Sequence, residues 1–130
     1  MGSATKILYD ADFAEWSALM AALLRARRFD ELDIDNIAEE IESLGKSNRL
    51  ALHSQMRRLL IHQIKRRIQP KKETASWRRS ILDSQHRIIA LLSDSPSLGR
   101  FLESNLDVIY RGAVHGALIE TGLSELLPDR

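Results

Sequence analysis

The chain has 130 residues, of which 44% are hydrophobic and 28% charged, and a formal net charge of +1 at pH 7. This length suits one domain with one core, and the composition is that of a folded rather than a disordered protein, so we expect a single domain over residues 1–130. The absence of cysteine excludes a disulfide framework and a zinc ribbon, and the absence of a long apolar run argues against a signal peptide or membrane span, which favours a cytoplasmic protein.

A first helix is predicted from Asp10 to Arg28, after a flexible N-terminus over residues 1–8. Asp12 and Glu15 have the spacing of a capping box at its start. Basic residues close its last turn, where cations suit the negative end of the helix dipole. The apolar residues on one face are Phe13, Trp16, Met20, Leu23 and Leu24.

A second helix is indicated by apolar residues at helical spacing after the connection FDELDID. These residues are Ile34, Ile37, Ile41 and Leu44. Asn36 and Glu39 repeat the spacing of a capping box, although Asp33 or Asp35 can cap the helix instead. The acidic side chains Glu39, Glu40 and Glu42 then lie on the flanks of the apolar face.

Gly45 either ends the second helix or lies inside one long helix that reaches Ile68. A glycine in a helix interior costs about 1 kcal/mol relative to alanine, which tertiary packing can override. The apolar spacing continues beyond it through Leu52, Met56, Leu59, Leu60 and Ile64. We therefore favour continuity, with Pro70 as the stop.

A further helix is predicted from Ala75 to Leu92, followed by a last helix that starts at Ser95 and Pro96. Serine is a common N-cap, and proline suits the first helical position. The first of these helices is expected to bury Trp77, Ile81, Ile88, Leu91 and Leu92. The apolar face of the second contains Leu98, Leu102, Leu106, Ile109, Ala113 and Ala117.

Three glycines give the last helix further features. Gly112 and Gly116 lie on nearly the same face and allow a neighbouring helix to approach closely, whether it belongs to this chain or to a second copy. Gly122 is the expected C-terminal cap, and residues 123–130 form a short tail. No period-two pattern predicts a strand. The predicted fold is therefore all-α, a single-domain bundle of four to five helices with a long central helix that is either continuous or broken or kinked at Gly45.

Several segments together resemble the bacterial family called domain of unknown function 29. The most specific are LDIDNIAEEIESLG and the distant pair SW, and the similarity covers roughly residues 9–123. The family is all-helical and has no established activity, so the resemblance implies a fold rather than a reaction. It implies binding candidates at Glu39, Glu40, His62, Lys65, Gln69 and Trp77. Arg66 stands where the family usually has an aromatic residue.

His62 and the arginines before it form the first candidate site. The R-x4-H spacing of Arg57 and His62 is similar to the motif of HEPN ribonucleases, in which arginine holds phosphate and histidine assists RNA cleavage. Arg58 shares a helix face with His62. The structural alternative, which we favour, is a partly buried His62 bonded to a carboxylate of the second helix. His53, His86 and His115 are interpreted as ordinary surface or boundary residues.

A metal site formed by His62 and Glu39, Glu40 or Glu42 is a weaker hypothesis. Di-iron sites in helical bundles use Glu-x-x-His on two helices, and this chain has no such pair. Ion pairs between these glutamates and basic residues of a neighbouring helix are the preferred interpretation. We expect no bound metal and no cofactor.

Charge is segregated along the chain. Residues 30–42 contain seven acidic side chains and no basic one, and residues 46–79 contain eleven basic side chains and the single acid Glu73. This pattern indicates either a polyanionic partner or two blocks that face one another. The nucleic-acid candidates are Arg57, Arg58, Lys65, Arg66, Arg67, Lys71, Lys72, Arg78 and Arg79.

The preferred functional hypothesis is a non-catalytic interaction module with a protein partner, or with a second copy of itself as a homodimer. A nucleic-acid-binding protein that uses the basic segment 57–79 is the first alternative. A metal-independent ribonuclease of HEPN type, with His62 and Arg57 or Arg58 in its site, is the second.

Overall fold

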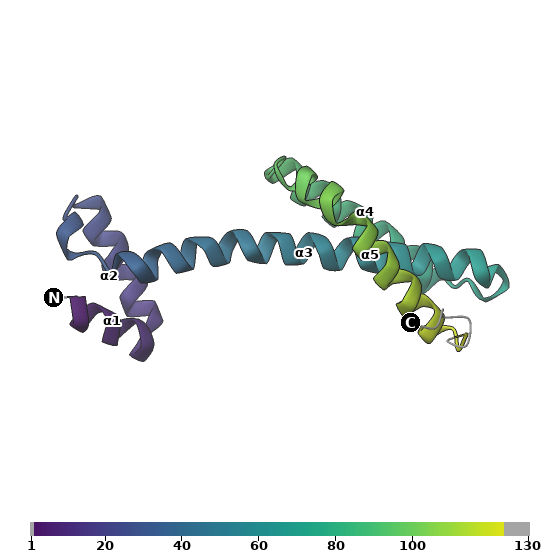
Figure 1. The fold of residues 1–130 in the computed structure, drawn as a ribbon, viewed down its shortest axis with the longest axis horizontal. Coiled ribbons are helices and arrows are strands. Elements are labelled where there is room, and N and C mark those ends of the chain that lie inside the picture. Colours follow the sequence, from purple (N-terminus) through teal and green to yellow (C-terminus); the bar gives the residue numbers. More distant parts are fainter. Residues whose placement is uncertain (1, 124–130) are drawn as a thin grey trace. The chain divides into compact units, whose positions relative to one another are not determined.

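The computed structural model describes residues 2–123, and almost all of this range is helical (Figure 1). The elements in chain order are α1 (Gly2–Ala11), α2 (Phe13–Arg25), the 3-10 turn η1 (Phe29–Glu31), α3 (Ile34–Ile68), the 3-10 turn η2 (Pro70–Lys72), α4 (Ala75–Asp94) and α5 (Leu98–Glu120). This confirms the all-α fold with five α-helices, and no strand occurs among residues 2–123. None of the described helices is long and apolar enough to cross a membrane.

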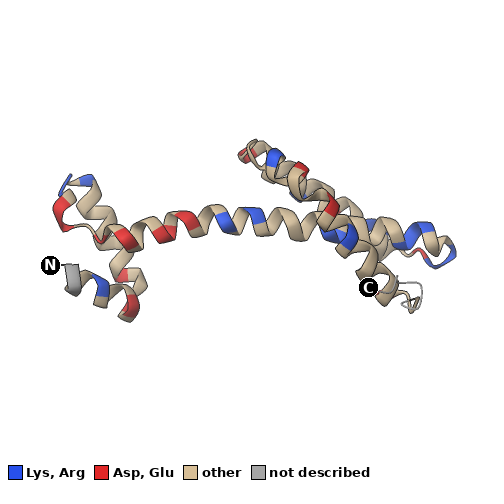
Figure 2. Ribbon diagram, viewed as in Figure 1, with Lys and Arg blue, Asp and Glu red and all other residues tan. Residues whose placement is uncertain are grey.

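Contacts between residues form two compact units. The N-terminal unit contains residues 1–46, and the C-terminal unit contains residues 47–130. Helix α3 contributes residues to both units. Along it the acidic residues come first and the basic residues follow, as the sequence indicates (Figure 2).

Two helices replace the single helix predicted at the start of the chain. The Asp12 N–H donates to the carbonyl of Leu8 at 2.8 Å, which ends α1, and the Asp12 side chain accepts from the Glu15 N–H at 3.1 Å, which caps α2. The predicted start at Asp10 is therefore wrong by three residues, although the capping residue is confirmed. Residues 1–8 were expected to be flexible, and Gly2–Ala11 is helical in the structure.

The end of the first predicted helix is also earlier than expected. Helix α2 ends at Arg25, and Arg27 has a φ of 59°, a left-handed backbone that rarely suits a residue with a side chain. The Arg28 N–H donates to the carbonyl of Leu23 at 3.0 Å. This bond reaches back five residues and satisfies a terminal carbonyl of α2, as in a Schellman cap.

Trp16, Met20 and Leu23 form the buried core of the N-terminal unit. Phe13 and Leu24, which were predicted on the same face, are half exposed. The partly buried residues around this core are Leu8, Tyr9, Leu32 and Ile37. The apolar positions Ile34, Ile41 and Leu44 of α3 are 63%, 63% and 69% exposed, so the helical period predicted the helix but not its burial.

Asp33 begins α3. It is 2% exposed, its carbonyl accepts the first helical bond from the Ile37 N–H at 3.0 Å, and its Oδ2 accepts from Trp16 Nε1 at 3.2 Å and from Asn36 Nδ2 at 2.7 Å. The preferred cap, Asn36, is therefore wrong, and the alternative, Asp33, stands at the start. These two donors satisfy Oδ2 of a buried carboxylate, whose burial would otherwise be more costly, whereas Oδ1 has no hydrogen-bond partner among the described residues.

Tyr9 should titrate at unusually high pH. Its hydroxyl donates to Glu40 Oε1, and this bond, with partial burial and the charge of Glu40, raises the pKa of Tyr9 to about 12. Because the folded pKa lies above the ordinary value of 10.0, the contact stabilises the fold below pH 10 and is lost as the pH rises towards about 12. In a Tyr110→Phe variant Tyr9 is the only tyrosine, and its near-ultraviolet absorbance should show this midpoint. Adding Glu40→Gln should lower the midpoint, and an unchanged midpoint would contradict the assignment.

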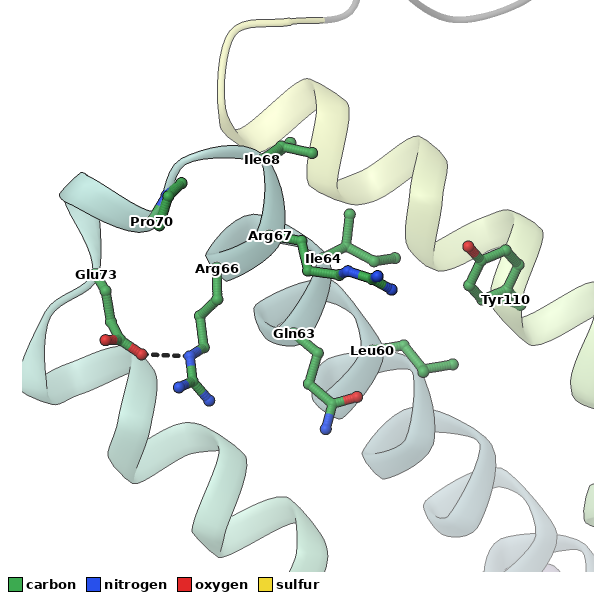
Figure 3. A pocket seen from close by; sticks show the side chains of 9 residues that line it. All are labelled: Leu60, Gln63, Ile64, Arg66, Arg67, Ile68, Pro70, Glu73 and Tyr110. Carbon is green, nitrogen blue, oxygen red and sulfur yellow. Dashed lines mark ion pairs between the residues drawn. The ribbon is translucent and has the colours of Figure 1, made fainter.

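Helix α3 runs without interruption through Gly45, as we favoured, and ends at Ile68. Pro70 follows as the first residue of η2, and α3 ends before it because proline cannot continue an α-helix. Arg66 of α3 forms an ion pair with Glu73, which follows η2 (Figure 3). Thr74 then caps α4, since its side-chain oxygen accepts from the Trp77 N–H at 3.2 Å.

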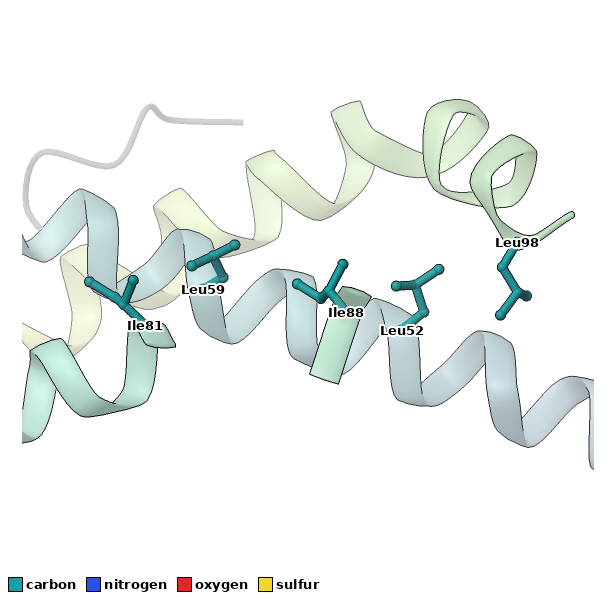
Figure 4. Close-up of a cluster of buried hydrophobic side chains, with 5 residues drawn as sticks. All are labelled: Leu52, Leu59, Ile81, Ile88 and Leu98. Atoms are coloured by element: carbon teal, nitrogen blue, oxygen red, sulfur yellow. The ribbon is translucent and has the colours of Figure 1, made fainter. Parts of the chain in front are cut away.

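The main core of the C-terminal unit joins α3 to α4 and to the start of α5 (Figure 4). Its buried residues are Leu52, Leu59, Ile81, Ile88 and Leu98. Met56, Leu91, Leu92, Phe101 and Leu102 pack against them. The residues that α4 was predicted to bury therefore lie in or next to this core, apart from Trp77, which is partly buried elsewhere. A second cluster joins α3 to α5 through Ile61, Ala113 and Ala117.

The predicted start of the last helix at Ser95 is wrong, whereas its predicted end is confirmed. The Ser95 N–H donates to the carbonyl of Leu91 at 3.0 Å, so Ser95 closes α4, and a turn leads to Leu98. At the other end Gly122 has a φ of +77°, and the Leu123 N–H donates to the carbonyl of Leu118 at 2.8 Å. These features form a Schellman cap. The rest of the predicted tail, residues 124–130, lies outside the described residues.

Candidate functional site

Part of the predicted basic segment is used to hold the C-terminal unit together. Lys65 is buried, with Nζ 3.5 Å from Glu120 Oε1 and 4.7 Å from the centroid of the Trp77 ring. Arg66 and Arg78 both pair with Glu73, with 3.5 Å from Arg78 Nη1 to Glu73 Oε2. The fold therefore already pairs these three cations with carboxylates, and the single charge of Glu73 is shared between two of them.

A second group of arginines has no carboxylate partner among residues 4–123, namely Arg57, Arg58 and Arg111. Arg58 Nη2 donates to the hydroxyl of Ser80 at 3.2 Å, and Arg111 Nε donates to the carbonyl of Asp107 at 3.4 Å. These bonds fix the side chains and leave their charge uncompensated. The exposed candidates Arg67, Lys71, Lys72 and Arg79 are likewise outside the ion pairs of the described residues.

The unpaired arginines line two cavities between α3 and neighbouring helices, which we call together the Arg57 groove. One cavity, of about 320 Å³, is lined by His53, Ser54, Arg57, Arg58, Ile61, His62 and Glu120. The other, of about 530 Å³, is lined by Arg57, Val108, Arg111, Gly112 and His115. Arg57 lines both. The groove thus joins three arginines and three histidines, with Glu120 as its one acidic lining residue, and Glu120 is paired with Lys65.

The glycines of α5 form the surface against which Arg57 lies. A Cβ atom added at Gly112 would lie 4.0 Å from Arg57 Nε, and one added at Gly116 would lie 3.5 Å from Arg57 Nη2 and 3.1 Å from Ile61 Cδ1. The close helix approach predicted from these glycines is therefore made by α3 of the same chain. They give no support to self-association.

The two glycines should respond differently to alanine. Gly112→Ala should stabilise the protein by about 0.5–1 kcal/mol, because the helix interior favours alanine and the nearest atom leaves room for a methyl group. Gly116→Ala gains the same helix propensity, but the added methyl group displaces the buried Ile61. Overpacking a core in this way costs about 1–3 kcal/mol. Urea denaturation should therefore place Gly116→Ala below Gly112→Ala in stability. The reverse order would contradict the close contact.

His62 is fixed by its own helix. Its Nδ1 lies 2.9 Å from the carbonyl oxygen of Arg58, which can only accept, so Nδ1 donates this bond, and in the neutral tautomer that does so Nε2 bears no hydrogen. The carboxylate partner that we favoured for His62 is therefore wrong. Residues 34–68 form one helix, so the acidic residues of the predicted second helix belong to the same helix as His62 and are not on a neighbouring helix that faces it. His62 faces a cavity that also contains Arg57, the residue with which it shares the R-x4-H spacing.

The remaining binding candidates do not gather at this groove. Glu39 and Glu40 belong to the N-terminal unit, where Glu40 accepts the hydrogen bond of Tyr9 and neither residue takes part in an ion pair of the described residues. The Gln69 N–H donates to the carbonyl of Lys65 at 2.9 Å, where the chain leaves α3. Trp77 contacts Lys65. No cluster of three or more potential metal ligands occurs within the described residues.

Sequence reasoning missed three groove residues, Arg111, His115 and His53. Arg111 and His115 are four residues apart on α5, so they share a face, and they alternate with Gly112 and Gly116. His53 and Arg57 have the same four-residue spacing on α3. This signal in two helices was available in the sequence, but nothing in the sequence showed that the two faces meet.

Comparison with known proteins gives one family. The family model described as "Domain of unknown function DUF29" matches residues 8–130. The comparisons found no match among curated proteins and none among solved structures. The match agrees with the resemblance carried by LDIDNIAEEIESLG and SW, and its description names no reaction.

Proposed function

Since the chain belongs to the DUF29 family, whose description assigns no activity, we propose from the geometry of the Arg57 groove that it is a non-catalytic protein that binds the phosphate backbone of nucleic acid. The observation that carries this proposal is that Arg57 lines one cavity with Arg58 and a second with Arg111, while none of the three has a carboxylate partner in the described residues. Guanidinium groups bind phosphate oxygens through charge-assisted, often bidentate bonds.

The electrostatics of the groove favour an anion. Like charges held close together repel one another, and a bound anion relieves this repulsion. The one acidic lining residue, Glu120, already lies 3.5 Å from Lys65 Nζ. We therefore place nucleic acid ahead of the protein partner, which was the preferred hypothesis from the sequence. We retain a cytoplasmic location as part of the proposal because the chain contains no cysteine.

The first test is binding of labelled RNA, single-stranded DNA and duplex DNA across a salt series. If three arginines each neutralise one phosphate, the logarithm of the binding constant for duplex DNA should fall with the logarithm of the salt concentration with a slope of about −3. Absence of retention at low salt would refute the proposal. Retention that does not change with salt would also refute it, because phosphate contacts release counter-ions.

A ribonuclease of HEPN type is the second candidate, because Arg57 and His62 line the same cavity. In this hypothesis Nε2 of the neutral His62 ring accepts the proton of an RNA 2′-hydroxyl, and the 2′-oxygen attacks the adjacent phosphorus while Arg57 binds the phosphate oxygens. The P–O5′ bond breaks, and the products are a 2′,3′-cyclic phosphate and a 5′-hydroxyl, whose oxygen takes its proton from water. The binding assay distinguishes the two functions when it is repeated with His62→Ala. Cleavage of RNA that disappears in this variant supports the ribonuclease, and retention of RNA without cleavage supports binding alone.

A further inference from the structure

A separate cavity of about 800 Å³ lies at the C-terminal end of α3, between η2 and α5 (Figure 3). Its volume is within the range of small-molecule sites, which is roughly 300–1,000 Å³. Its apolar lining residues are Leu60, Ile64, Ile68 and Pro70. A surface of this kind binds the hydrocarbon part of a ligand, because burial removes apolar area from water.

Two arginines line this cavity, and only one of them has a carboxylate partner among the described residues. Arg66 pairs with Glu73, which also pairs with Arg78 at 3.5 Å. Arg67 has no carboxylate partner within residues 4–123, and its guanidinium lies on the side of the cavity where Tyr110 stands (Figure 3). Tyr110 is 52% exposed, so its hydroxyl is accessible as a second donor.

We propose that this cavity binds a small amphipathic anion, namely an unbranched aliphatic carboxylate of the fatty-acid class. The hydrocarbon chain lies on Ile64 and Ile68, and the carboxylate accepts hydrogen bonds from the guanidinium of Arg67 and the hydroxyl of Tyr110. The combination of an apolar lining with one uncompensated cation selects this class, because a neutral lipid leaves Arg67 unpaired and a bare phosphate does not use the apolar lining. The site shares no lining residue with the Arg57 groove, so it stands independently of the proposed function.

Calorimetric titration with three ten-carbon probes tests the proposal: decanoate, decanol and decyltrimethylammonium, each below the concentration at which it forms micelles. Decanoate should bind saturably, and decanol about tenfold more weakly, because it lacks the charge-assisted bonds. The cationic probe should not bind. Equal binding of the three probes, or no saturable binding of decanoate, would overturn the proposal.

Three variants assign the binding to the cavity. Arg67→Glu should weaken decanoate binding by about tenfold or more, and Ile68→Glu should weaken decanoate and decanol together by placing a charge in the apolar lining. Both side chains are exposed, so circular dichroism should show the helical content of the wild type. Arg87→Glu, an exposed position of α4 outside the cavity, makes the same charge change and should leave binding within about twofold. A loss in Arg87→Glu equal to that in Arg67→Glu would show that only net charge matters.

Discussion

The double variant Arg57→Glu/Arg111→Glu should bind nucleic acid at least about 100-fold more weakly than the wild type. A charge-assisted hydrogen bond contributes about 1.5–3 kcal/mol, and tenfold in affinity corresponds to about 1.4 kcal/mol, so two lost arginine contacts are sufficient. The glutamates also repel the phosphates. Fluorescence anisotropy with labelled duplex DNA measures the loss, and the slope of the salt dependence should become less negative by about two units.

The matched control is Arg87→Glu/Arg100→Glu. Both positions are exposed and lie outside the Arg57 groove, on α4 and α5, and the double variant has the same net charge as the groove variant. It should lose much less affinity. If the two double variants lose affinity equally, binding follows the overall charge of the protein, and the groove is not the site.

Trp16→Ala should unfold the N-terminal unit while the C-terminal unit stays folded. Trp16 is 3% exposed, its ring contacts those of Tyr9 and Phe13 at centroid distances of 4.8 and 5.5 Å, and its Nε1 donates to the buried Asp33. Replacing a buried tryptophan by alanine costs about 3–5 kcal/mol. Such a loss is comparable with the whole stability that a core of this size provides.

Hydrogen exchange measured by mass spectrometry can separate the two units. In Trp16→Ala the amides of α1 and α2 should lose protection, and those of α4 and α5 should keep it. Phe13→Ala is the control, because Phe13 belongs to the same aromatic cluster but is 50% exposed, so its truncation should cost much less. Equal loss of protection in both units would contradict the division of the chain near Lys46.

The helices were predictable where apolar spacing and a strong stop signal coincide. Helix α3 is the clearest case: the spacing continues across Gly45, and Pro70 fixes the end, so its continuity and its C-terminal boundary follow from local rules. The boundary at Ser95 did not follow. Serine followed by proline suits both the start of a helix and a turn after a helix, and only the bond from Ser95 to Leu91 decides between them.

Contacts between segments account for the remaining errors in the fold. Asp33 rather than Asn36 starts α3 because Trp16, seventeen residues earlier, donates to its carboxylate. Helix α1 was missed because it is short and has neither an acidic residue in its first turn nor a basic residue in its last turn to mark its ends. Its residues Leu8 and Tyr9 pack against the Trp16 cluster. Neither contact can be read from local sequence.

The residues of the candidate site that lie on one helix were predictable from the sequence, and those from a second helix were not. Arg57, Arg58 and His62 lie within six residues of one helix, so their spacing alone placed them together. Arg111 and His115 come from α5, and their approach to Arg57 depends on the packing of Gly112 and Gly116 against α3. The size of the basic segment was misleading, because Lys65, Arg66 and Arg78 already have a carboxylate partner in Glu73 or Glu120.

The two tryptophans of the chain are divided between the units, with Trp16 in one and Trp77 in the other. Each unit therefore contains its own intrinsic fluorophore, and no external label is needed to follow them separately. The Trp16→Ala variant emits only from Trp77, beside the ammonium group of Lys65 at 4.7 Å. Lys65 also pairs with Glu120, which lines the Arg57 groove, so the emission of this single indole offers an optical readout of anion binding in the C-terminal unit.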